Sequence, residues 1–160
     1  MAKSKEEKTN VMRTLEQKKL PYTAHTYDPA GPIDGVSVAQ TLGQLPECVF
    51  KTLVTKGASG AYYVFDIPVA ENLDLKKAAK AVGEKSVAML PQKELLPLTG
   101  YVHGGCSPVG MKKQFPTVFH ETVLLYDTVC VSAGKIGFQV ECRPGDLVAL
   151  LRAKTADIIV

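Results

Sequence analysis

The stretch His103-Gly104-Gly105-Cys106-Ser107-Pro108-Val109-Gly110 decides how the rest of this chain is interpreted. Glycine permits positive φ angles and the close approach of a ligand or a second backbone, while proline stiffens the chain between the glycines. A rigid loop with bare amides is suited to hold an oxygen-rich ligand or a developing oxyanion. A tight turn between two strands would have the same composition, because short glycine-rich motifs are weak evidence on their own.

Two further stretches give the loop a context. Val49-Phe50-Lys51-Thr52-Leu53-Val54 places a lysine within an apolar run, and Val131-Ser132-Ala133-Gly134-Lys135-Ile136-Gly137 is a second glycine turn. In this order the three motifs resemble the YbaK family, the bacterial Cys-tRNA(Pro) deacylases, which is related to the editing domain inserted in bacterial prolyl-tRNA synthetases. The resemblance extends from His25-Thr26-Tyr27-Asp28 to the carboxy terminus.

Length and composition predict an ordinary globular protein. The chain has 160 residues, 46% of them hydrophobic and 22% charged, so we expect residues 1–160 to form a single domain around one core. No run reaches the ~18 apolar residues that a membrane span needs. The first eight residues lack an apolar signal core, so we expect a cytoplasmic protein with no membrane partner.

The sequence spacing does not predict a metal site. The four cysteines and three histidines stand at Cys48, Cys106, Cys130, Cys142, His25, His103 and His120. None of the cysteines forms a Cys-x-x-Cys pair and the histidines are scattered, so we expect neither metal nor cofactor. A net charge of +3 is too small to indicate nucleic-acid binding by itself. It suits a protein that contacts RNA briefly, and we expect no DNA partner.

Turn and cap signals divide the chain into short elements. We expect strands over residues 22–27, 49–55, 61–67, 86–90, 117–120, 128–132 and 138–142, with an edge strand over 155–160. Capping boxes begin helices at Ser4 and Ser37, Asp74 caps a helix over 75–82 that Gly83 ends, and Pro144 begins a last helix. This pattern predicts an α+β domain with a mixed, barrel-like sheet and several short helices.

Lys51 is the first candidate site residue. Strand alternation places it on a face with Leu53 and Thr55, and both faces of this strand carry apolar side chains, so Lys51 is expected to be at least half buried. A lysine whose stem covers apolar surface while its head reaches water would fit the same pattern. The resemblance implies instead that Lys51 is the essential polar residue of a pocket and contacts the ester end of a charged tRNA.

No convincing protein nucleophile is present. Cys106 and Ser107 are the candidates, but the presence of His103 three residues earlier is no evidence for a nucleophile–base pair. The family commonly has an aliphatic residue where Cys106 stands, so we expect Cys106 to be a pocket wall. We expect Ser107 to hold its own loop or to bind ligand.

Oxyanion stabilisation and positioning are then the remaining means of catalysis. The backbone amides of Gly104, Gly105, Ala133 and Gly134 are suited to bind a carbonyl oxygen. The resemblance adds further substrate-binding positions, namely Tyr27 at the pocket edge, Pro108, Ser107, Ser132 and Gln139. The sequence departs from the family pattern at two places. Ser132-Ala133-Gly134 stands where many relatives have Ser-Gly-Gly, and Gln139 stands where some relatives carry an acid.

The resemblance implies a trans-editing deacylase that removes cysteine from mischarged Cys-tRNA(Pro). In this family the substrate thiol is thought to attack its own ester carbonyl, expelling tRNA and leaving a cyclic thioester. Mischarged tRNA(Pro) is the implied partner, together with prolyl-tRNA synthetase. Two alternatives stay open at this point: a deacylase for Ala-tRNA(Pro) or another small amino acid, and a non-catalytic tRNA- or synthetase-binding module.

Overall fold

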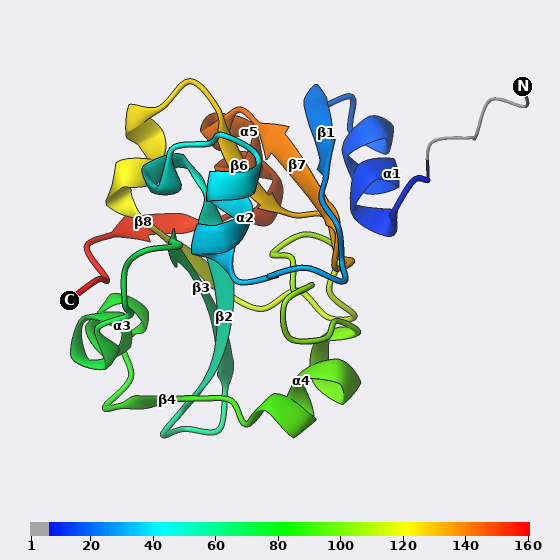
Figure 1. The fold of residues 1–160 in the computed structure, drawn as a ribbon. Coiled ribbons are helices and arrows are strands. Elements are labelled where there is room, and N and C mark those ends of the chain that lie inside the picture. Colours follow the sequence, from blue (N-terminus) through cyan, green and yellow to red (C-terminus); the bar gives the residue numbers. More distant parts are fainter. Residues whose placement is uncertain (1–6) are drawn as a thin grey trace, which may run out of the picture.

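The computed structural model describes residues 7–160 as an α+β fold of two open sheets with helices around them (Figure 1). The elements in chain order are α1 (Asn10–Gln17), β1 (Tyr22–Thr26), α2 (Gly35–Thr41), the 3₁₀ helix η1 (Pro46–Cys48), β2 (Phe50–Gly57), β3 (Tyr62–Pro68), α3 (Leu75–Val82), β4 (Val87–Met89), α4 (Gln92–Thr99), β5 (Thr117–His120), η2 (Glu121–Leu125), β6 (Val129–Ser132), β7 (Phe138–Cys142), α5 (Pro144–Leu151) and β8 (Lys154–Ala156).

The larger sheet has the strand order β4-β2-β3-β5-β8. β2 is antiparallel to both β3 and β4, whereas β5 is parallel to β3 and β8 is parallel to β5. β4 pairs with β2 only from Thr55 to Gly57. The part of β2 before Thr55 therefore has an unpaired edge, and this edge borders the cavity described below.

The smaller sheet is antiparallel, in the order β1-β7-β6. An isolated parallel bridge between Val49 and Cys130 joins it to the start of β2. The predicted mixed sheet and short helices are confirmed, but the expected barrel-like closure is wrong, because neither sheet closes on itself. β1 and β6 are edges of the smaller sheet, and β4 and β8 are edges of the larger one.

Two main apolar clusters fix the sheets. On one face of the smaller sheet, Val131 and Val140 pack with Leu15 of α1 and Leu147 of α5. The larger sheet packs against α3 through a separate cluster that includes Phe65, Ile67, Ala78 and Ala79. The other face of the smaller sheet is polar and looks towards α2, which packs at the junction between the sheets.

Helix starts differ from the sequence prediction in two places. The capping box at Ser4 lies outside the described residues; α1 begins after Thr9, whose side chain accepts from Met12 N at 3.3 Å. The expected cap at Ser37 is wrong, because Asp34 caps α2 by accepting from Ser37 N at 3.1 Å. Aspartate is as strong a cap as serine and stands earlier in the chain.

The start of α2 also requires glycine. A Cβ atom on Gly35 would lie 2.4 Å from Val69 Cγ1, so the helix begins where only a glycine lets the two segments meet. By contrast, the predicted Asp74 cap and the Gly83 terminus of α3 are confirmed.

α4 was not predicted, because Pro97 lies inside it and proline removes a helical N–H. Thr99 adds a hydrogen bond at the end of this helix by donating its hydroxyl to Leu95 O at 2.7 Å. None of the helices over residues 7–160 is long and apolar enough to cross a bilayer.

Candidate active site

A cavity of about 360 Å³ opens beside the unpaired edge of β2. Five of the predicted site residues line it: Tyr27, Lys51, Gly104, Ser132 and Gln139. Its apolar walls include Ile33, Val36, Val38, Leu53 and Leu95. The three sequence motifs, which are distant along the chain, therefore meet at one hollow.

Lys51 carries a charge that no residue of the described chain neutralises by contact. Its side chain is partly buried, and its Nζ has neither a hydrogen bond nor an ion pair within residues 7–160. Burial lowers the pKa of Lys51, and the charge of Glu71 offsets part of that effect. A lysine ammonium group that lines a cavity without an acceptor is available for an oxygen of a bound ligand.

Thr52 adds a backbone donor next to Lys51. The carbonyl of Val54 accepts from Leu90 N at 3.0 Å, so the polar groups of Val54 point away from β3. Backbone groups alternate along a strand, and Thr52 stands two residues before Val54. The N–H and C=O of Thr52 therefore also point away from β3. No strand pairs with β2 there, and Thr52 lines the cavity.

Asp66 lies opposite Thr52 in the β2–β3 ladder and is fully buried. The Thr52 hydroxyl donates to Asp66 Oδ1 at 2.5 Å, whereas Oδ2 has no hydrogen-bond partner among the described residues. Burial raises the pKa of Asp66 to about 8, so this carboxyl is mostly protonated at neutral pH. We did not predict a role for Asp66 from the sequence, although an acid within the apolar run of β3 was a usable signal.

The glycine loop and the second glycine turn are packed against each other. A Cβ atom on Gly105 would lie 3.1 Å from Ile136 N and 3.4 Å from Lys135 C, so the backbones meet where the side chain is missing. Gly104 has a φ of +88°, a conformation that glycine adopts readily. Ser107 is buried, and its hydroxyl accepts from Val109 N at 3.2 Å, so it holds its own loop.

Most of the expected oxyanion donors are already used within the protein. Gly105 N donates to Val102 O at 3.0 Å, Ala133 N to Phe138 O at 3.0 Å, and Gly134 N to the Ser132 hydroxyl at 3.1 Å. Among the four expected amides in the described chain, that of Gly104 has no protein partner. Five of the expected site residues are not among those that line the cavity: Gly105, Ser107, Pro108, Ala133 and Gly134.

Cys106 and His103 both line the cavity but do not form a reactive pair. Burial, with a smaller contribution from the charge of Asp66, raises the pKa of Cys106 to about 12. No hydrogen bond joins His103 to the thiol in the described chain. Because the thiolate is the nucleophilic form, Cys106 fits the expected wall residue rather than a nucleophile.

Gln139 is a buried lining residue of the cavity and is held by Gln44, which the sequence did not single out. Gln44 Nε2 donates to Gln139 Oε1 at 2.7 Å, and Gln139 Nε2 donates back to Gln44 Oε1 at 3.3 Å. The pair connects the segment after α2 to β7. Asp34, Val36 and Val38 of the α2 region were also missed, because cavity walls carry no chemical signature in sequence.

The site and fold can be compared with known proteins. A family model described as "Aminoacyl-tRNA editing domain" matches residues 34–150. A protein of Enterococcus faecalis named "Putative Cys-tRNA(Pro)/Cys-tRNA(Cys) deacylase EbsC" is 46% identical over 160 residues, covering 99% of this chain and 98% of that protein.

Two solved structures share the fold. A crystal structure of "a putative trans-editing enzyme for prolyl tRNA synthetase" has a TM-score of 0.81 at 29% identity and covers 94% of each chain. Another, of hypothetical protein APE2540, has a TM-score of 0.86 at 23% identity and covers 94% of this chain and 99% of that chain, which shows the fold alone. The family match spans all three motifs that meet at the cavity, and so this chain belongs to the aminoacyl-tRNA editing domain family, of the YbaK type.

Proposed function

We propose that this protein is a deacylase that removes cysteine from mischarged Cys-tRNA(Pro). The observation that carries the proposal is Lys51, a partly buried cation that has no acceptor among the described residues. The described residues that line its cavity form no nucleophile–base pair. Family membership supplies the reaction class, and the 46% identical relative carries Cys-tRNA(Pro) and Cys-tRNA(Cys) in its name. A non-catalytic binding module could use the same lysine, so the deacylation assay below distinguishes the two.

The residues of the cavity can divide the work of ester cleavage. Within residues 7–160, Lys51 Nζ, Thr52 N–H and Gly104 N–H are donors without a partner, and all three residues line the cavity. We assign Lys51 to the terminal ribose or phosphate of the tRNA, and the two amides to the ester carbonyl oxygen, where negative charge develops. Tyr27 and Ser132 line the cavity as further substrate contacts, and so does Gln139, which Gln44 holds.

The substrate thiol supplies the nucleophile that the protein lacks. Its sulfur attacks the ester carbonyl carbon, the bond from that carbon to the ribose oxygen breaks, and the ribose oxygen takes up a proton. The products are free tRNA and a cyclic thioester, which water then hydrolyses to cysteine. Positioning of this kind reaches effective molarities of ~10⁵–10⁸ M, enough to replace an enzyme nucleophile.

The alternative substrate is Ala-tRNA(Pro) or a tRNA charged with another small amino acid. The apolar walls of the cavity suit any small side chain. Alanine carries no thiol, however, and its ester could be cleaved only by a bound water. The absence of a nucleophile–base pair at the cavity therefore favours cysteine.

Selection of the tRNA is a separate question from selection of the amino acid. We propose that the protein acts in the cytoplasm, where aminoacyl-tRNA is made, and that prolyl-tRNA synthetase supplies the tRNA(Pro) specificity. The structural relative described as a trans-editing enzyme for prolyl tRNA synthetase supports this link.

The test is a deacylation panel with purified protein. tRNA(Pro) is charged separately with cysteine, alanine and proline, and tRNA(Cys) with cysteine, and each is assayed with and without prolyl-tRNA synthetase. We expect rapid release of cysteine, slow release of alanine and no release of proline. Prolyl-tRNA synthetase should accelerate the reaction on Cys-tRNA(Pro) but not on Cys-tRNA(Cys). Faster release of alanine than of cysteine would show that the substrate is Ala-tRNA(Pro). Inactivity on every ester would indicate a non-catalytic binding module.

A further inference from the structure

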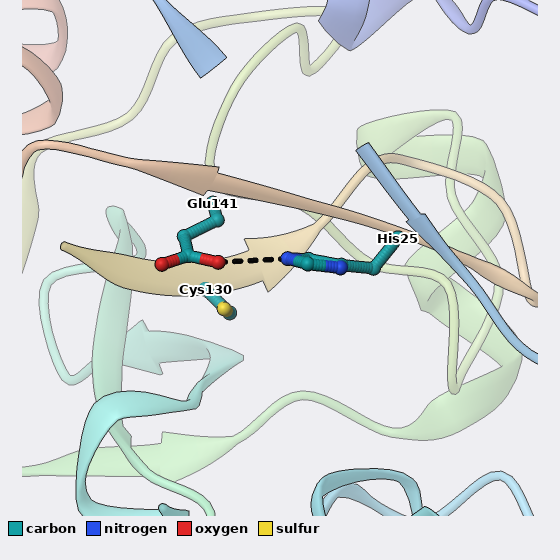
Figure 2. Close-up of side chains that lie close together, drawn as sticks. All are labelled: His25, Cys130 and Glu141. Atoms are coloured by element: carbon teal, nitrogen blue, oxygen red, sulfur yellow. Dashed lines mark hydrogen bonds and ion pairs between the residues drawn. The ribbon is translucent and has the colours of Figure 1, made fainter. Parts of the chain in front are cut away.

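Three side chains of the kinds that bind transition metals meet on the polar face of the smaller sheet (Figure 2). They are His25 of β1, Cys130 of β6 and Glu141 of β7. One imidazole nitrogen, the sulfur and one carboxylate oxygen all lie within 4.8 Å of one another. His25 Nε2 and Glu141 Oε1 are already in contact at 2.7 Å.

The strand register fixes this arrangement. Cys130 is directly opposite Glu141 in the β6–β7 ladder, and His25 is opposite Gln139, two residues before Glu141. Residues two apart on a strand share a face, so all three side chains leave the sheet on the same side. The separation of these residues in sequence hid the cluster, because ligands from three strands produce no Cys-x-x-Cys or His-x-x-His spacing.

The donor set matches zinc. Imidazole nitrogen, thiolate sulfur and carboxylate oxygen are its usual ligands, with bonds of about 2.0–2.3 Å. Tetrahedral geometry at those bond lengths sets the ligand atoms about 3.4–3.6 Å apart. The observed 2.7 Å contact and the 4.8 Å limit bracket this spacing, so small side-chain rotations bring the atoms into place.

The groups around the cluster suit a bound metal. Gln44 Nε2 is 3.6 Å from Cys130 Sγ and can donate to a thiolate there, and Thr128 donates its hydroxyl to the second oxygen of Glu141. Such outer contacts orient metal ligands. Cys130 is 4% exposed, whereas the side chains of His25 and Glu141 are 28% and 32% exposed. The cluster is therefore closed on the sulfur side and reachable from solvent on the other.

We propose that His25, Cys130 and Glu141 form a three-ligand Zn²⁺ site with a fourth position open to water. Binding replaces the His25–Glu141 contact and displaces the thiol proton of Cys130 to solvent, with no change in oxidation state. None of the three ligands lines the cavity. Gln44 contacts both Cys130 and Gln139, so the metal site lies next to the active site but remains separate from it.

Co²⁺ is the probe, because it binds the same ligands as Zn²⁺ and its absorption spectrum depends on which ligands it binds. Tag-free, reduced, metal-stripped protein is titrated with Co²⁺ and followed by absorption. We expect one equivalent to produce a sulfur-to-cobalt charge-transfer band in the near ultraviolet and the visible bands of a tetrahedral ion. One equivalent of Zn²⁺ should then remove both.

Matched variants locate the sulfur. Cys130→Ser should lose the charge-transfer band, whereas Cys142→Ser, which changes a buried thiol on the opposite face of the same sheet, should keep it. His25→Gln and Glu141→Gln, at partly exposed positions, should weaken cobalt binding at least tenfold, and they decide the question if Cys130→Ser does not fold. No band in the wild type, or an unchanged band in Cys130→Ser or in both ligand variants, would overturn the proposal.

Discussion

At the scale of single residues, Lys51 lines the cavity, its ammonium group has no acceptor in the part of the chain that the structure describes, and burial lowers its pKa. Lys51→Ala should therefore reduce deacylation by at least ~100-fold, because the tRNA end is then no longer positioned and a misplacement of this kind can cost ~100-fold. The free energy of unfolding should stay the same or rise, because site residues are selected for function rather than for stability. Single-turnover rates and thermal melts measure the two effects.

Lys56 is the matched control. It is on the same strand but is exposed, with its Nζ 5.7 Å from the centre of the Tyr62 ring. Lys56→Ala should retain wild-type rates. A folded Lys51→Ala protein with wild-type turnover would remove Lys51 from the site.

The thiol of Cys106 gives the second prediction. With a pKa raised to about 12, it is almost entirely protonated between pH 7 and 8, and only the thiolate reacts. Iodoacetamide should label it slowly at these pH values, as peptide mass spectrometry can measure, and Cys106→Ser should keep deacylation within a few fold. Rapid labelling, or an acyl group trapped on Cys106 in the wild type, would establish an enzyme thiol as the nucleophile.

Residue chemistry was partly readable from the sequence. Lys51 stood out because a charge in an apolar strand needs an explanation, and Asp66 carried the same signal unnoticed. The amides of Gly105, Ala133 and Gly134 could not be assigned correctly, because composition does not reveal which N–H groups a loop uses for itself. Gln44 gave no signal at all, since its role depends on which strand it meets.

At the scale of elements, the glycine loop and the 134–137 turn support each other at Gly105. A branched side chain there would collide with the backbone of Lys135 and Ile136, so Gly105→Val should separate the two segments and impair activity more than Cys106→Ser does. Gly145→Val is the control, since nothing lies within 4 Å of its Cβ position. Deacylation rates decide, and equal activity of Gly105→Val and Gly145→Val would contradict the packing argument.

The β2–β3 hairpin carries a pH-sensitive group in Asp66. Its pKa is about 8 in the folded state and ~3.9 in an unfolded chain. Between these two pH values the unfolded chain releases the proton, whereas the folded protein keeps it, and this difference favours unfolding. The stability that the protonated carboxyl gives the fold is therefore fully present only below pH ~4. It is lost as the pH rises to about 8.

Asp66→Asn cannot ionise, so it should escape the loss of stability that the wild type suffers as the pH rises. At pH 8 its melting temperature should exceed that of the wild type by roughly 10–20 °C, because pKa values of about 8 and ~3.9 imply ~5 kcal/mol at that pH, and the difference should shrink towards pH 4. Asp127→Asn, at an exposed position, should leave the wild-type pH dependence unchanged. Parallel melting curves for wild type and Asp66→Asn at every pH would show that the buried carboxyl does not titrate as described.

Most strands were predictable because apolar and β-branched residues mark them directly, as in β2, β3 and β7. α4 was missed because Pro97 argues locally against a helix that its surroundings stabilise. The cap of α2 was misplaced because Asp34 and Ser37 offer equivalent chemistry, and only the contact of Gly35 with Val69 distinguishes them.

At the scale of the whole molecule, the cavity exists because the two sheets stay open. The unpaired edge of β2 faces α2, the glycine loop and the polar face of β6 and β7. Sequence patterns predicted the strands but not this opening, because closure depends on how far β4 pairs along β2. The order of the motifs identified the family, whereas their meeting in space required the fold.

The whole account depends on a cavity that positions a substrate and leaves the nucleophile to it. The most direct test compares single-turnover deacylation of Cys-tRNA(Pro) and Ser-tRNA(Pro), whose side chains differ by one atom and are nearly isosteric. Exclusion by size cannot favour cysteine, because oxygen is smaller than sulfur. A thiol, unlike a hydroxyl, is partly ionised near neutral pH.

We predict that the cysteinyl ester is cleaved at least ~100-fold faster, a factor typical of one lost catalytic group, and that its rate climbs as the pH approaches the thiol pKa of ~8.5. Equal rates on the two esters, or a flat pH profile while chemistry limits the rate, would contradict the account and leave a water-based reaction in the same cavity.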